Sequence, residues 1–218
     1  MGLIESSIAR KVAMALSGLF LVFFLLQPFS INLTSVFSEE AFNAASHFMG
    51  TNPVVQFALQ PVLIFGVVFH FIMGFILEAR NRSARAVSYA KYNGSANASW
   101  MSRNMIYTGI VVLAFLGLHF YDFWVPEIVY KYVDVNEAQA DRYYDELVHK
   151  FVSPVRTALY CVAFVFLALH LLHGFASSFQ SMGLNNKYSA GIQTFAKAFA
   201  VVIPLGFIFI ALFHHFNH

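Results

Sequence analysis

The sequence predicts an all-α integral membrane protein with five transmembrane helices, because its composition is strongly apolar and its apolar segments are long. Of its 218 residues, 59% are hydrophobic and only 11% are charged, whereas soluble domains average about 25% charged residues. The mean hydropathy is +0.64. Five separate segments supply the roughly 20 apolar residues that a helix needs to cross a bilayer core. We therefore expect residues 1–218 to form one helical membrane domain.

The five predicted helices follow one another along the whole chain. The first begins beside the basic pair Arg10 and Lys11 and is too long for the apolar core of a signal peptide, so we expect it to be retained. The second, third and fourth helices each contain histidine, whereas the fifth contains none. The predicted helices cover approximately residues 12–36, 54–77, 104–124, 155–180 and 198–213.

Lysine and arginine predict the orientation, because the cytoplasmic loops of membrane proteins hold an excess of both. Four of the 13 basic residues lie between the third and fourth predicted helices. The other nine lie before the first helix or beside the connections after the second and fourth: Arg10, Lys11, Arg80, Arg82, Arg85, Lys91, Arg103, Lys187 and Lys197. We expect the N-terminus inside and the C-terminus outside. A net charge of +2 with no basic stripe gives no support for nucleic-acid binding.

Two connections on the predicted outer side are long. The segment 38–53 is too polar to span a membrane, and we expect it to lie along the outer surface. The connection 126–154 is long enough for a short surface helix around residues 136–150.

Two histidines in the apolar helices share one local pattern. His70 and Gly74 occur in FHFIMG, and His170 and Gly174 occur in LHLLHG. Residues four apart lie one above the other on a helix, so a flat macrocycle ligated by the histidine could rest against the glycine backbone. At 1.5 Å per residue, His70 lies about 12 Å and His170 about 15 Å from the inner boundary. The matched depths predict a bis-histidine haem site.

The other histidines leave more alternatives open. His119 is predicted near the outer end of the third helix, and the same level of the first helix holds Pro28, which cannot ligate a metal. His173 could replace His170 as a ligand or hydrogen-bond to a haem propionate. Any of these imidazoles could instead only hydrogen-bond to a neighbouring helix. Five more are expected at or beyond the outer interface, where exposed histidine is ordinary: His47, His149, His214, His215 and His218.

These patterns together resemble a known family. The stretches SSIARKVAMALSGLFLVFFLLQ, HFIMG, HLLHG, SRNM and GLHFYDFW and the five-helix layout are similar to the membrane-anchor cytochrome b subunit of succinate:quinone oxidoreductases. The similarity is to the single-polypeptide, five-helix, two-haem type that also occurs in fumarate reductases, and it covers nearly the whole chain. It implies that His70 and His170 ligate the inner haem b and that His119 ligates an outer haem.

Position 28 departs from the family, whose members of this type have a histidine in the first helix. Pro28 should kink that helix as well as remove the ligand. The outer haem would then be absent, five-coordinate on His119, or held by a substitute; Gln27 is the neighbour, but it points about 100° away on a regular helix. We expect a weakened or altered outer site.

The resemblance implies an electron-transfer subunit of an enzyme complex in a bacterial cytoplasmic membrane. A flavoprotein subunit would oxidise succinate, an iron–sulfur subunit would carry the electrons to the membrane, and this chain would pass them through haem b to a quinone, expected to be menaquinone. The chain has no dinucleotide fingerprint and only one cysteine, Cys161, so the other cofactors must lie on partner subunits. Succinate oxidation and fumarate reduction remain equally open.

The finer site residues are candidates from the same resemblance. Arg103 with Ser102, and also Arg10, are candidates for pairing with haem propionates. The candidates for quinone contacts near the outer haem are Ser30, Asn32, Gln60 and Asp122.

Two alternative functions remain. The chain could be a haem-poor structural anchor for a peripheral enzyme. It could also be a proton or ion transporter with a histidine relay, but such a relay would need acidic partners at membrane depth, and the middle of all five predicted spans has none.

Overall fold

The computed structural model describes residues 6–83, 100–184 and 187–218, and the regular secondary structure in these ranges is helical. Five helices are long and apolar enough to cross a membrane, by length and composition. They are Ser7–Thr34, Val55–Ser83, Met105–Val133, Pro154–Ser181 and Ser189–Asn217. The predicted fold class, an all-α membrane protein with five spans, is confirmed.

The first, fourth and fifth spans are single helices, and the other two contain π-helical turns. The spans comprise α1 (Ser7–Thr34); η2 (Val55–Leu59) with α3 (Gln60–Ser83); α5 (Met105–His119) with η4 (Phe120–Trp124), α6 (Val125–Ile128) and η5 (Val129–Val133); α8 (Pro154–Ser181); and α9 (Ser189–Asn217). The short helices are α2 (Glu39–Thr51), α4 (Trp100–Arg103) and α7 (Tyr143–Phe151).

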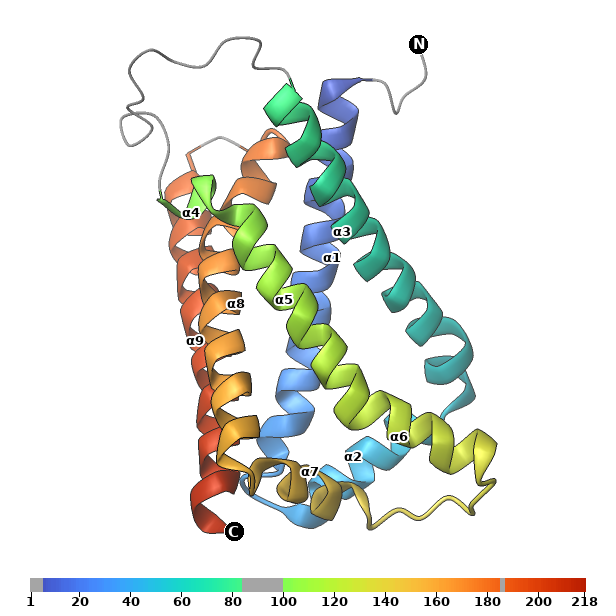
Figure 1. Ribbon diagram of the computed structural model, residues 1–218. Helices are drawn as coiled ribbons and strands as arrows, with labels where there is room; N and C mark the ends of the chain where they lie inside the picture. The colour runs from blue at the N-terminus through green and yellow to red at the C-terminus, as the bar shows by residue number, and fades with distance from the viewer. Residues whose placement is uncertain (1–5, 84–99, 185–186) are drawn as a thin grey trace.

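Four of the spans form a ring, and the fifth covers it from outside. α1 packs against α3 and α8, and α5 packs against the same two helices, so α1 faces α5 and α3 faces α8 across the bundle. α9 packs along α8 and α1, and Figure 1 shows it running beside α8. The beginning of α1 and the end of α9 lie at opposite ends of the bundle (Figure 1). Which end faces the cytoplasm stays a prediction.

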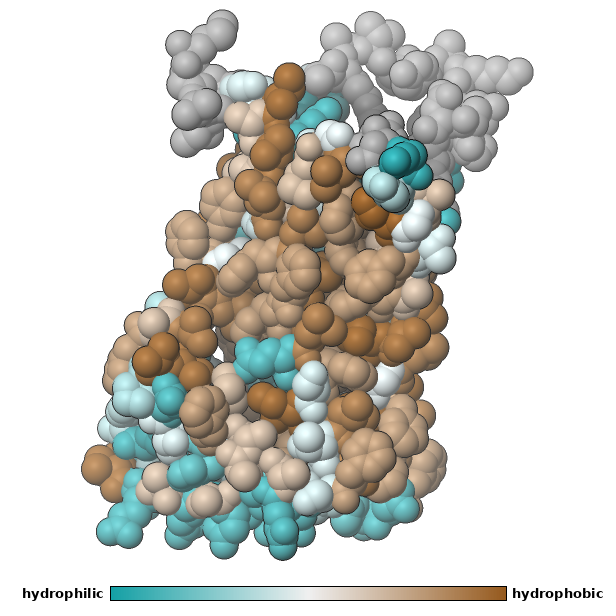
Figure 2. All heavy atoms as spheres, turned by 180° about the vertical axis from the view of Figure 1, so that it is seen from behind, coloured by the Kyte–Doolittle hydropathy of each residue, from teal (hydrophilic) through white to brown (hydrophobic). Residues whose placement is uncertain are grey.

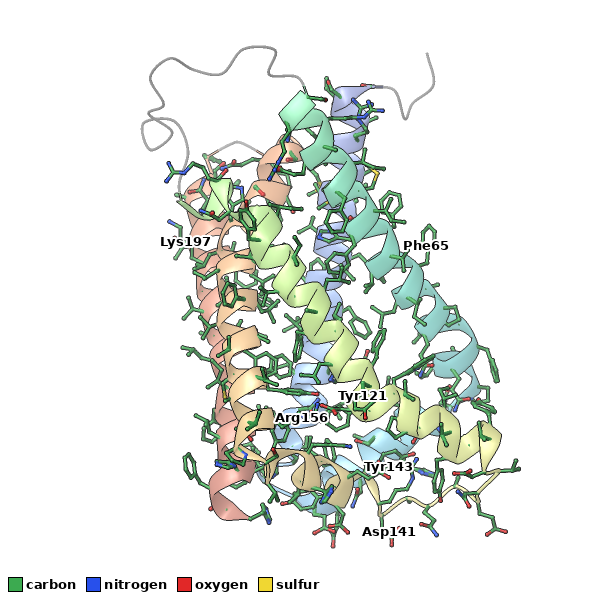
Figure 3. The ribbon with its side chains drawn as sticks, in the orientation of Figure 1. Phe65, Tyr121, Asp141, Tyr143, Arg156 and Lys197 are labelled. Atoms are coloured by element: carbon green, nitrogen blue, oxygen red, sulfur yellow. The ribbon has the colours of Figure 1, made fainter. Side chains whose placement is uncertain are left out.

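The densest packing lies where α9 meets α8 and α1, and large apolar side chains are exposed over much of the outside of the bundle. The buried residues of this seam are Leu19, Val22, Leu171, Phe175, Ala196, Phe199, Ala200 and Ile203. Elsewhere large apolar side chains such as Phe65, which is 69% exposed, point away from the bundle (Figure 3). Figure 2 shows apolar side chains over the middle of one face and polar ones at its lower end. This distribution suits a molecule surrounded by lipid.

Two short helices, α2 and α7, cover the end of the bundle opposite the N-terminus (Figure 1). The Asn43 side chain joins them, donating to the Asp141 carbonyl at 3.1 Å and accepting from the Tyr144 backbone N–H at 2.8 Å. Arg142 adds an ion pair to Glu127 on the third span. The polar segment 38–53 was expected only to lie along the outer surface, and most of it forms α2 across this end of the bundle. That this end is the outer one stays a prediction. The second surface helix begins at Tyr143, later than the predicted start at residue 136.

The helices differ from the predicted ranges mainly at their ends. α1 begins at Ser7 because the Ser6 hydroxyl caps it, accepting from the Ala9 N–H at 3.5 Å. The third span continues to Val133, because the ion pair of Glu127 with Arg142 holds its last turns against the start of α7. α9 begins at residue 189, where residue 198 was predicted, because its first turns pack on α8. α1 continues through Pro28, at which a kink was predicted. Arg85 and Lys91 lie outside the described residues.

Candidate metal centre

The structure brings His70 and His170 together from opposite helices of the ring. Their ring centroids are 6.4 Å apart and their planes are inclined by 73°. A metal–imidazole nitrogen bond is about 2.0–2.1 Å long and a ring nitrogen lies roughly 1 Å from the ring centre, so two axial imidazoles on one metal have centroids about 6 Å apart. The observed separation fits two axial ligands on a single metal.

The donor set favours a metal that brings its own equatorial ligands. Among residues 6–83, 100–184 and 187–218, no group of three or more His, Cys, Asp or Glu side chains could hold a bare metal ion. Two facing imidazoles could instead ligate a haem iron, since the macrocycle provides the other ligands. The residues present therefore fit a haem, and the ligand roles of His70 and His170 stay a prediction.

Each histidine of this pair contacts a buried hydroxyl that the sequence interpretation did not identify. Ser17 Oγ of α1 lies 3.0 Å from His70 Nδ1, and Thr108 Oγ1 of α5 lies 3.2 Å from His170 Nδ1. Both side chains are buried, with 9% and 2% exposure. The signal in the sequence is the similarity of MALSG at residues 14–18 to MIYTG at residues 105–109.

The two predicted glycines lie beside this pair, and each faces a methionine. A Cβ added at Gly74 would lie 3.6 Å from Met14 Cε, and one added at Gly174 would lie 2.9 Å from Met105 Cε. A methionine end is flexible and can be displaced. The end of a methionine from α1 or α5 therefore stands beside each glycine, in the space that was expected to accommodate a macrocycle.

The other inner candidates lie toward the N-terminal end of the bundle. His173 is half-buried on α8, one turn beyond His170. Arg10 lies about 10 Å before Ser17 along α1 at 1.5 Å per residue. Arg103 and Ser102 belong to α4, which packs on α8 and α5. These positions place polar groups one to two turns from the histidine pair, on the side where the propionates were predicted.

The outer histidine lies in an aromatic surrounding. His119 is about 16 Å further along the third span than Thr108, at 1.5 Å per residue. Its ring centroid is 5.2 Å from that of Phe123 and 5.9 Å from that of Phe115, and its Nδ1 atom is buried with no hydrogen-bond partner in the described part of the chain. Gln27, the neighbour of Pro28 on α1, donates from Nε2 to Met49 Sδ of α2 at 3.2 Å, so its side chain is turned toward α2.

Of the quinone candidates, only Asp122 is buried. It is 1% exposed, accepts a hydrogen bond of 2.8 Å from the Tyr160 hydroxyl and pairs with Arg156 Nη1 at 3.1 Å. Figure 3 shows Arg156 between α8 and the third span. Ser30 and Asn32 donate instead to carbonyls of their own helix, Leu26 and Pro28, at 2.8 Å each, and Gln60 begins α3 as a half-buried residue.

His214 was predicted to be exposed, and this prediction is wrong. Its side chain is fully buried, and Nε2 lies 2.8 Å from Ser35 Oγ. The reason is that α9 continues to residue 217, so that His214 lies within the helix. α7 packs against this end of α9 and places the Tyr144 ring centroid 5.6 Å from that of His214.

Fold and site together define a multi-pass helical membrane protein with one facing histidine pair inside its helix ring. Comparison with curated proteins finds similarity to the succinate dehydrogenase cytochrome b558 subunit of Bacillus subtilis (strain 168), at 26% identity over 163 residues, covering 74% of this chain and 72% of that protein. No family model and no solved structure matches the chain. The similarity thus extends over most of the length of both proteins.

Proposed function

We propose that this chain is the membrane-anchor cytochrome b subunit of a succinate dehydrogenase or fumarate reductase and passes electrons between an iron–sulfur subunit and a membrane quinone. The observation that carries the proposal is the facing of His70 and His170 across the ring at 6.4 Å. Haem b bound between them would supply a one-electron carrier. Similarity to a succinate dehydrogenase subunit over most of the chain supports the assignment.

The two histidines would determine what kind of chemistry takes place. His70 from α3 and His170 from α8 would both ligate the haem iron, and a haem held by two histidines would supply electron transfer. The helix ring provides a surrounding of low dielectric constant, in which neighbouring dipoles act strongly on the potential. Nothing in this arrangement acts on succinate itself, so that reaction would belong to the flavoprotein subunit.

The outer site would be weakened or altered. His119 would be one ligand of an outer haem, but Pro28 stands at the predicted level on the facing helix α1 and has no donor atom in its side chain. The hydrogen bond from Gln27 to Met49 holds the Gln27 side chain toward α2. We therefore propose that the haem between His70 and His170 is the one that this chain ligates from two sides.

The quinone, which we propose is menaquinone, would react near Asp122 at the outer level. A cavity of about 500 Å³ there is lined by Asp122, Pro126, Asp145, Glu146, His149 and Lys150. Its volume is in the range of small-molecule sites, about 300–1,000 Å³, but such sites are mostly apolar, so this open, mostly charged pocket would suit only the polar head group of a quinone. Asp122 with Arg156 and Tyr160 would offer polar contacts to a quinone head group.

The end of the bundle that carries the N-terminus would face the cytoplasm and bind the soluble subunits. Lys197 of α9 lies toward this end, whereas Asp141 and Tyr143 lie at the opposite end (Figure 3). Of the nine basic residues predicted to lie inside, the seven in the described ranges are Arg10, Lys11, Arg80, Arg82, Arg103, Lys187 and Lys197, all of which belong to this end or its connections. This distribution agrees with the excess of positive charge on cytoplasmic loops, in a bacterial cytoplasmic membrane.

A visible reduced-minus-oxidised spectrum of the purified protein tests the proposal. The unmodified chain is expected to show b-type bands with about one haem per polypeptide. His70→Ala and His170→Ala should lose the bands, whereas His173→Ala and the exposed control His149→Ala should keep them. Absence of bands from the unmodified chain would favour the structural anchor or the transporter. Bands that persist in His170→Ala but vanish in His173→Ala would transfer the ligand role to His173.

A further inference from the structure

We propose that Ser17 and Thr108 are a matched pair of positioning residues that fix the ring tautomers of His70 and His170. In each case the hydroxyl oxygen accepts the Nδ1–H of the imidazole, so that Nε2 carries the lone pair that binds the metal. This role rests on the proposed function, because it concerns the imidazoles as ligands. It also gives the site two equivalent halves, each built by one pair of helices.

The direction of these hydrogen bonds follows from counting protons. A hydroxyl group has one proton to donate. Ser17 Oγ lies 2.9 Å from the Met14 carbonyl, and Thr108 Oγ1 lies 2.9 Å from the Met105 carbonyl, and each donates there. A carbonyl can only accept. Toward the histidine the same oxygen must therefore be the acceptor.

The tautomer of each histidine follows from that direction. A neutral imidazole has one N–H and one lone pair, on different nitrogens. If Nδ1 of His70 donates to Ser17 at 3.0 Å and Nδ1 of His170 donates to Thr108 at 3.2 Å, the lone pair lies on Nε2 in both rings. Metal-ligating histidines nearly always donate their second ring N–H in this way, which fixes the ring and raises its basicity.

A glycine next to each hydroxyl supports the ring edge. A Cβ added at Gly18 would lie 3.4 Å from His70 Cε1, and one added at Gly109 would lie 3.5 Å from His170 Cε1. The backbone of the hydroxyl-bearing helix therefore lies close beside the imidazole. One helix thus supplies both the hydrogen bond and the steric support for the histidine of its neighbour.

The two halves repeat the same contacts. Residues 14–18 of α1 and 105–109 of α5 both read Met-x-x-Ser/Thr-Gly, and both facing helices carry His-x-x-x-Gly. The methionine of each hydroxyl helix also lies against the glycine of its own partner, with Met14 near Gly74 and Met105 near Gly174. The pair α1/α3 and the pair α5/α8 therefore direct matching sets of contacts at the two imidazoles. A flat ligand between them would be held equivalently from both sides.

The chain also offers a matched control outside this site. Ser35 Oγ donates to the Asn32 carbonyl at 2.6 Å and lies 2.8 Å from His214 Nε2, so it makes the same kind of hydroxyl–imidazole contact. The ring nitrogen involved is the other one, and the pair lies at the opposite end of α1. Removing this hydroxyl should affect local packing but not the metal.

The test uses the complete protein with its bound haem and measures haem per polypeptide and the midpoint potential. Ser17→Ala and Thr108→Val remove the acceptors, and we expect each to weaken haem binding about 10-fold to 100-fold and to raise the midpoint potential, because a less basic imidazole stabilises the oxidised iron less. Ser17→Thr and Thr108→Ser keep a hydroxyl, so both variants should have the haem content and the midpoint potential of the unmodified protein. Ser35→Ala should leave them unchanged.

Each outcome decides between the two proposals. If the unmodified protein binds haem through His70 and His170 but Ser17→Ala and Thr108→Val keep its affinity and potential, the positioning role is wrong and the proposed function stands. The positioning role is also wrong if Ser17→Thr and Thr108→Ser shift the midpoint potential as much as Ser17→Ala and Thr108→Val do. If Ser17→Ala does not assemble, Ser17→Cys serves instead, because a thiol is only a weak acceptor. An unmodified protein without haem would contradict both proposals.

Discussion

The contact between Gly18 and His70 predicts how much side-chain volume the inner site tolerates. A Cβ at Gly18 would stand 3.4 Å from His70 Cε1 and 3.4 Å from Ser178 Oγ, which is ordinary van der Waals distance. Any further carbon must enter space held by the imidazole or by α8. The structure therefore predicts a sharp difference between alanine and larger residues at this position.

The expected magnitudes follow from these distances. Gly18→Ala adds one methyl group at contact distance and removes a glycine from a helix interior, which favours the helix by about 1 kcal/mol, so haem binding should be kept. Gly18→Leu forces carbons against His70, and overpacking of this kind costs about 1–3 kcal/mol. That cost corresponds to about 5-fold to 150-fold weaker haem binding.

Haem titration of each variant, followed by the b-type bands, measures this difference. The matched control is Gly117 in α5, where an added Cβ meets nothing within 4 Å, so both Gly117→Ala and Gly117→Leu should bind haem normally. Normal haem binding by Gly18→Leu would refute the reasoning, since His70 could not then be held against α1 as described. Equal loss in both leucine variants would show a general effect of bulk in the helices.

Three further predictions concern the outer half of the molecule. Pro28→His should restore a ligand facing His119 and raise the haem content from about one to about two per polypeptide; an unchanged count would show that position 28 does not face the ring centre. Asp122→Ala should cost about 1–3 kcal/mol in thermal unfolding, because it leaves the Tyr160 hydroxyl unpaired, whereas Asp122→Asn keeps an acceptor and should cost less; equal losses would contradict this. Burial and then the Glu127 carboxylate raise the pKa of Tyr143 from 10.0 to about 12, so the folded protein keeps a proton that the unfolded chain loses, and stability should fall between pH 10 and about 12 but not below pH 10. Tyr143→Phe should remove that part of the pH dependence, and an unaltered alkaline transition would exclude Tyr143 as its source.

The sequence was sufficient to predict the five spans and to select the histidines that the fold brings together. Apolar segments of membrane length are a strong signal, and the shared spacing of His70 and Gly74 with His170 and Gly174 marked two helices that face each other. The hydroxyl partners were missed, because a lone Ser or Thr in an apolar helix commonly bonds only to its own backbone. Ser17 and Thr108 do bond to their own backbone, and their second role depends on which helix is the neighbour.

Position along the chain was a poor guide to burial near the outer end. His214 lies four residues from the last residue of the sequence, yet it is fully buried, with Tyr144 of α7 and Ser35 against its ring. Asp122 could be placed near the outer level but not paired, since Arg156 and Tyr160 come from a different helix. These partners are set by tertiary packing, which local pattern and helical periodicity do not report.

The separation of about 16 Å between the Thr108 level and His119 along the third span has a consequence for energy conversion. It is about half of the roughly 30 Å hydrocarbon thickness. In the proposed function, an electron that travels from the paired histidines to a quinone beside Asp122 moves negative charge outward through half of the membrane's electric field. At about 2.3 kcal/mol per charge for 100 mV, this step exchanges roughly 1 kcal/mol with the membrane voltage. The turnover rate would then depend on that voltage as well as on substrate supply.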